Sequence, residues 1–123
     1  MAEGIVRRSD PAEEAPVERA SGARMQVLIG PNEGAPHFVT RKFTIEPGGQ
    51  IPAHRHPEIE HEQFVLHGAM RLGIGDAVHE VKAGEAVYIP AGTVHWYENP
   101  HSEPVEFLCI VPRTASYETE WIE

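Results

Sequence analysis

The stretch GGQIPAHRHPEIEHEQFVLHG, at residues 48–68, decides the fold, and it brings His54, His56 and His61 close together. In an extended segment, residues two apart point to the same face about 7 Å from each other, so His54 and His56 can share one ion. Imidazole is a natural neutral ligand for Zn, Mn, Fe, Co, Ni and Cu. For this pair alone, a metal site and an ordinary surface placement are both open.

A second stretch, GEAVYIPAGTVHWYEN at residues 84–99, places a fourth histidine, His95, shortly after a Pro- and Gly-containing turn. Short apolar segments lie within and around both stretches, and breaks rich in Gly and Pro, such as 47–57, separate one segment from the next. The segments are 25–29, 37–46, 60–67, 69–74, 77–82, 86–89, 94–99 and 105–111. Many short strands with turn residues between them predict an all-β sandwich or barrel.

Both stretches resemble the two sequence motifs of the cupin superfamily. The first motif is Gly, five residues, His-x-His, three or four residues, Glu, six residues and Gly; the second is Gly, five residues, Pro-x-Gly, two residues, His, three residues and Asn. The matching positions here are Gly48, His54, His56 and Gly68, and then Gly84, Pro90, Gly92, His95 and Asn99. The resemblance implies a single cupin β-barrel, a jelly roll of two packed antiparallel sheets, over residues 23–123 behind a short N-terminal arm at 1–22.

The resemblance also implies metal ligands at His54, His56 and His95. We expect His61 to be the fourth ligand, because it keeps the six-residue count to Gly68, although the family has Glu here and Glu60 or Glu62 is the alternative. Four neutral ligands would leave the full charge of a divalent ion, with two open positions if it is six-coordinate. Mn or Fe would suit such a reactive site best, and Ni, Co, Cu and Zn are further possibilities.

Other side chains are candidates for the pocket around the ion. Strand alternation places Arg41 on the same face as Val39, Phe43 and Ile45, so its guanidinium is expected either to hold an anionic ligand or to reach water or a glutamate at the barrel mouth. Family geometry implies pocket or plain core positions for Gln63, Tyr97, Phe107 and Cys109. The remaining histidines are expected at the surface, and they are His37, His67, His79 and His101.

The charge balance argues against some partners. The chain has 10 Lys and Arg against 19 Asp and Glu, a net charge of -9 that repels nucleic acid and anionic membranes. Its single cysteine, Cys109, allows no intrachain disulfide, and no apolar run is typical of a signal peptide, so we expect a cytoplasmic protein. We also expect a homodimer, with contacts at 25–29 and in the arm.

The resemblance implies a metal-dependent enzyme acting on a small molecule, but a fold alone does not select the reaction. We favour a dioxygenase-like oxidoreductase, because four histidines would leave a redox-capable ion with adjacent open positions. The alternatives are a non-catalytic protein that binds a metal or small ligand, and a cupin isomerase or decarboxylase.

Overall fold

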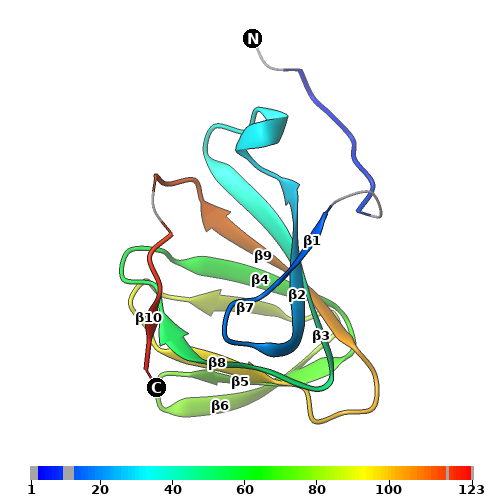
Figure 1. Ribbon diagram of the computed structural model, residues 1–123, viewed down its shortest axis with the longest axis vertical. Helices are drawn as coiled ribbons and strands as arrows, with labels where there is room; N and C mark the ends of the chain where they lie inside the picture. The colour runs from blue at the N-terminus through cyan, green and yellow to red at the C-terminus, as the bar shows by residue number, and fades with distance from the viewer. Residues whose placement is uncertain (1–2, 10–12, 116, 123) are drawn as a thin grey trace.

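The chain folds almost entirely into β-strands, as the sequence predicts (Figure 1). A computed structural model describes residues 3–9, 13–115 and 117–122. The strands are β1 (Glu14–Pro16), β2 (Ser21–Ile29), β3 (Phe38–Arg55), β4 (His61–His67), β5 (Ala69–Ile74), β6 (Ala77–Lys82), β7 (Ala86–Ile89), β8 (His95–Glu98), β9 (Val105–Pro112) and β10 (Glu120–Trp121), with a short 3-10 helix at Pro31–Glu33. No helix in these ranges is long and apolar enough to cross a membrane.

β3 is the longest strand, and it belongs to both sides of the barrel. Its first half pairs with β2 and β9, and its second half pairs with β8 and β10. The expected break over 47–57 was therefore wrong for most of its length, because the strand continues to Arg55. Irregular pairing beside this region, between Ser21 and Ala23 on β2 and between Ile51 and His54 on β3, lets the strand bend instead of ending.

All strand pairs are antiparallel, and they follow the order β6-β5-β8-β3-β9-β4-β7. The two expected layers are thus β6-β5-β8 on one side and β9-β4-β7 on the other, joined through β3 into one hydrogen-bonded sheet that curls on itself (Figure 1). The curled sheet places the ends of strands that are distant in sequence around one opening.

The core lies inside the curl, and strand alternation determines which side chains enter it. On β9, Val105, Phe107, Cys109 and Val111 are buried, whereas Glu106 is partly exposed, as alternation predicts. The rest of the buried apolar side chains come from β3, β4, β5, β6 and β8 and from the loop before β4, and they include Val39, Ile45, Ile51, Ile59, Val65, Met70, Leu72, Val81 and Tyr97.

Two short strands near the chain ends were not predicted. β1 pairs with β2, so β2 is hydrogen-bonded along both edges, to β1 and to β3. β10 pairs with the end of β3, with Trp121 opposite His54. Their sequences contain only three and two residues and show no alternation, so only the pairing makes them strands. The homodimer stays a prediction, and the edge of β2 is covered within the chain.

Gly68, in the tight turn between β4 and β5, should tolerate no side chain. It has a φ of +79°, and an added Cβ would lie 2.4 Å from the carbonyl oxygen of Pro104. Gly84 has a similar φ of +92°, but nothing lies within 4 Å of an added Cβ. We expect Gly84→Ala to cost about 1 kcal/mol from backbone strain alone, and Gly68→Ala about 2–4 kcal/mol because of the added clash. Urea unfolding measures both, and equal losses would contradict the role given to Pro104.

Candidate metal centre

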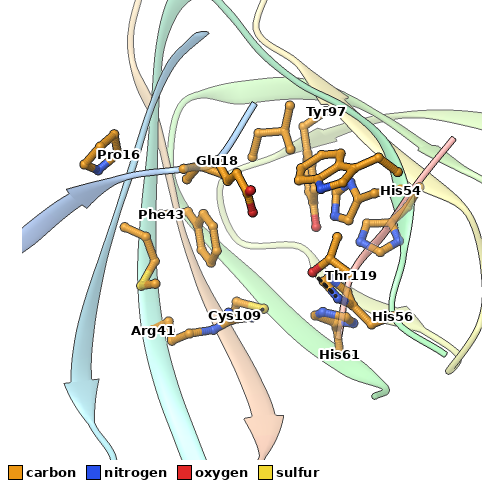
Figure 2. Close-up of a pocket in the computed structure, with 15 residues that line it drawn as sticks. Pro16, Glu18, Arg41, Phe43, His54, His56, His61, Tyr97, Cys109 and Thr119 are labelled. Carbon is orange, nitrogen blue, oxygen red and sulfur yellow. Dashed lines mark hydrogen bonds between the residues drawn. The ribbon is translucent and has the colours of Figure 1, made fainter. Parts of the chain in front are cut away.

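Four histidines from three strand ends meet inside the opening of the barrel. His54 lies near the end of β3, His56 follows that strand, and His61 and His95 begin β4 and β8. His54 and His95 are direct partners across the β3–β8 pair. Figure 2 shows the imidazoles of His54, His56 and His61 grouped on one side of the cavity. The curled sheet therefore brings together residues up to 41 positions apart.

Three of the four form a compact cluster. The ligand nitrogens of His54, His56 and His95 lie within 4.8 Å of one another. His61 is adjacent, with its ring centroid 4.9 Å from that of His56 and 5.3 Å from that of His95. The three-histidine cluster thus agrees with the sequence motifs, and the place of His61 as a fourth ligand stays a prediction.

Backbone carbonyls orient the rings of the cluster. The Nδ1 atoms of His54 and His95 contact the carbonyl oxygens of Pro52 and Thr93, at 2.7 and 2.9 Å. The Nδ1 atom of His56 contacts the carbonyl oxygen of Glu118 at 3.1 Å. A carbonyl can only accept, so each Nδ1 carries the hydrogen and each Nε2 keeps a free lone pair. This is the tautomer that a metal ligand needs.

Burial keeps these imidazoles neutral. Desolvation lowers the pKa of His61 to about 2 and that of His95 to about 3, with smaller contributions from neighbouring histidines. Desolvation also lowers the pKa values of His54 and His56. Neutral imidazoles do not repel a cation, so the cluster is prepared for one before it binds.

His61 points toward the cluster, whereas its acidic neighbours do not. Its side chain is buried, and its Nδ1 atom has no hydrogen-bond partner among the described residues. Glu60 and Glu62 are exposed and line a groove on the outer surface with Phe38 and Ile110. Parity along β4 therefore directs His61 inward and the two glutamates away from the cluster.

The cluster faces a cavity of about 190 Å³. Of the expected pocket residues, Arg41, Tyr97 and Cys109 line it, whereas Gln63 and Phe107 are buried one layer behind. Gln63 donates a hydrogen bond to the Tyr97 hydroxyl at 2.7 Å, and Phe107 stacks between Phe43 and Tyr97. The other walls, which the sequence did not reveal, are Pro16, Val17, Glu18, Met25, Phe43, Ile51, Thr119 and Trp121.

Both ends of the chain contribute to the mouth of the cavity. Glu18 comes from the turn between β1 and β2, and its carboxylate extends into the opening in Figure 2. Trp121 packs near the ring of His54 at 5.0 Å between centroids, and the guanidinium of Arg19 lies 5.3 Å from the Trp121 ring. Thr119 Oγ1 lies 3.2 Å from His56 Nδ1. The C-terminal segment thus both closes the cavity and orients one histidine of the cluster.

Comparisons with known proteins agree with this architecture. The sequence profile of the family described as Cupin domain matches residues 41–111, which is more than half of the chain. The chain belongs to the cupin family. Its fold superposes on the structure of the polyketide cyclase RemF from Streptomyces resistomycificus with a TM-score of 0.86, at 31% identity over 100% of this chain and 87% of that one.

Two curated relatives show how widely the domain is used. Acireductone dioxygenase 1 of Nocardia farcinica is 35% identical over 98 residues, which are 73% of this chain and 51% of the relative. A mannose-1-phosphate guanylyltransferase of Salmonella muenchen is 27% identical over 86 residues, and the chain spans only 18% of its length. The cupin domain is therefore a part of larger proteins in some relatives.

The residues present fit a divalent metal. Three Nε2 lone pairs are oriented toward one point, and a fourth buried imidazole has no partner for its Nδ1 atom among the described residues. Burial keeps the imidazoles neutral, so together they form a typical set of nitrogen donors.

The four exposed histidines, His37, His67, His79 and His101, lie at the surface as predicted.

We predict that His61 contributes to metal affinity and that Glu60 and Glu62 do not. His61→Ala should weaken binding about 100-fold or more, since loss of an outer-shell partner alone costs 10- to 100-fold. His67→Ala is the matched control, because His67 lies on the same strand and is exposed. Calorimetric titration with Mn²⁺ or Co²⁺ measures the affinities. Loss of binding in Glu60→Gln or Glu62→Gln, with His61→Ala unaffected, would reverse the assignment.

The metal-free protein should lose stability as the pH falls from 7 to 5. In the unfolded chain His61 and His95 take up protons near their ordinary pKa of 6.5, whereas in the folded chain their pKa values are about 2 and about 3. Between pH 7 and pH 5 only the unfolded state therefore gains these protons, which lowers its free energy relative to the folded state. Thermal melting after treatment with a chelator measures the effect. His61→Gln removes one titrating group and should flatten the dependence, whereas an unchanged slope would contradict the explanation.

Proposed function

We propose that this cupin is a metal-dependent enzyme that binds a small molecule through carbonyl oxygens and closes it into a ring. The observation that carries the proposal is the set of histidine nitrogens on one side of a cavity whose other walls are mostly aromatic and apolar. The likeness to a polyketide cyclase, which extends over the whole chain, supports cyclisation as the reaction.

The metal would be held by His54, His56 and His95, with His61 as the fourth ligand. When bound there, it would polarise carbonyl oxygens and so make the adjacent C–H bonds more acidic. Phe43 and Tyr97 offer flat ring surfaces to an unsaturated carbon skeleton, and Ile51 and Met25 exclude water from it.

Tyr97 is placed to donate a proton to a substrate oxygen. Its hydroxyl oxygen accepts from Gln63, and no acceptor for its hydrogen is found among the described residues. Burial raises the pKa of Tyr97, with the nearby Cys109 adding to the effect, so the phenol keeps its proton at neutral pH. In the closed core of the cavity, this hydrogen is available to a carbonyl oxygen as negative charge develops there.

Glu18 is the complementary proton acceptor, because it is the carboxylate among the described residues that line the cavity. In the proposed step, a proton leaves the carbon beside a carbonyl for Glu18, and that carbon forms a bond to a distant ketone carbon. The ketone oxygen then takes the proton of Tyr97. The new hydroxyl group then leaves as water together with a proton from the neighbouring carbon, which makes the product lighter by one water. Proton exchange with solvent restores Glu18 and Tyr97, so no oxidant is required.

A dioxygenase-like reaction is the second candidate. Its support is the 35% identity to acireductone dioxygenase 1 over most of this chain, together with a ligand set of neutral histidines that suits Fe or Mn. The two reactions differ in a simple way, because a dioxygenase consumes one O₂ per turnover and an aldol cyclase consumes none.

Linear di- and triketones, such as heptane-2,4,6-trione, distinguish the two. The cyclase proposal expects a product lighter by one water and no oxygen uptake by the metal-loaded protein. Tyr97→Phe should then lower kcat about 100-fold without changing metal content, and Tyr88→Phe, an exposed tyrosine outside the cavity, should have no effect. Oxygen uptake that matches product formation would replace cyclisation by the second candidate, and no reaction with any ketone would reject both.

A further inference from the structure

Arg41 is a cation in the wall of the cavity that has no carboxylate partner among the described residues. One amino nitrogen, Nη2, donates to Cys109 Sγ at 3.1 Å, and the guanidinium carbon lies 5.1 Å from the centroid of the Phe43 ring. Its Nε atom is buried without a hydrogen-bond partner, and no ion pair between described residues includes it. A thiol and a ring are weak partners for a charge, so the side chain keeps most of its five N–H donors unused.

The fold gives Arg41 this position for a definite reason. Arg41 lies near the start of β3, opposite Val27 on β2 and Cys109 on β9. Its side chain is partly buried, and it lines the wall of the cavity. No ion pair between described residues joins it to Glu18, the glutamate at the mouth.

Arg41 also marks the junction of two cavities. Arg41 and Met25 line both the cavity of about 190 Å³ that holds the histidines and an outer cavity of about 640 Å³. The outer cavity has charged and polar side chains in its walls, with Arg7, Glu13, Glu33 and Asn32 among them. Arg7 and Glu33 pair with each other at 2.8 Å, so Arg41 is the cation there that has no acidic partner.

The side chain of Arg41 extends into the cavity that the histidines line. In Figure 2 it extends from β3 past Cys109 toward the region of His61. A ligand that contacts the histidine cluster at one end can therefore reach Arg41 at the other.

We propose that Arg41 binds a carboxylate of the substrate, while the carbonyl end lies at the histidines and any further chain extends into the outer cavity. A single unpaired cation matches a monoanion, and the planar guanidinium fits a carboxylate through two parallel hydrogen bonds. This inference rests on the proposed binding of carbonyl groups at the histidines, and it identifies the substrate class as an acidic polycarbonyl compound.

Two probes with the same seven-carbon chain test the carboxylate separately from the carbonyl groups. Both 4,6-dioxoheptanoate and heptane-2,4-dione carry one 1,3-diketone, but only the first carries a carboxylate. Isothermal titration of the zinc-loaded protein measures each affinity, and in neither probe are the two ketones far enough apart for ring closure. We expect the acid to bind at least about 10-fold more tightly than the dione.

Arg41→Met should abolish that difference while leaving the affinity for the dione and the zinc content unchanged, and Arg41→Lys should retain part of it. Thermal melting of both variants shows whether they are folded. An equal preference for the acid in wild type and Arg41→Met, or no preference in wild type, would overturn the inference. If the dione fails to bind but the acid binds through Arg41, the carboxylate site stands and the proposed function falls; if neither binds, both fall.

Discussion

Antiparallel pairing along the two halves of β3 is the constraint on which the rest of the structure depends. The first half hydrogen-bonds to β2 and β9, and the second half hydrogen-bonds to β8 and β10. Because one strand of 18 residues belongs to both sides of the barrel, the register of each side is fixed relative to the other. Arg41 near one end of this strand and His54 near the other therefore face the same cavity.

The orientation of the histidines depends on contacts of two different kinds. His54 and His95 are held by carbonyl oxygens two residues earlier in their own segments, so forming the strand is enough to orient them. His56 is held by the carbonyl oxygen of Glu118, from a segment 62 residues away. The C-terminal segment stays in place through the β10–β3 pair and the ion pair between Arg55 and Glu120. Any opening of that segment would therefore also release the ring of His56, which couples access to the cavity with the metal site.

The strands could be predicted from the sequence because alternation is local, whereas the meeting of His95 with His54 and His56 was implied by the resemblance to the cupin motifs. Alternation of apolar residues placed most strands within a residue or two, and the burial of Tyr97 and Cys109 follows from the same parity. What the sequence did not reveal depends on long-range pairing. β1 and β10 are too short to show alternation, so the contributions of Glu18 and Trp121 to the cavity appear only once the chain ends are placed over it. The continuation of β3 through Pro47 and Gly48 was likewise hidden, because turn residues at a bend resemble turn residues at a strand end.

The distribution of charge then explains how an acidic protein can favour an acidic ligand. The chain carries a net charge of -9, but its carboxylates are mostly at the surface, where salt screens them beyond about 8 Å. Inside the cavity the balance is different, since the histidines are neutral, Arg41 is cationic, and the one carboxylate among the described lining residues, Glu18, lies at the exposed mouth. Screening is weaker there than in open water, so this one partly buried guanidinium acts more strongly on an anion beside it than distant surface carboxylates do. A metal ion on the histidines would increase this positive field. The same arrangement would select against cationic molecules, so the inner surface determines which ligands bind.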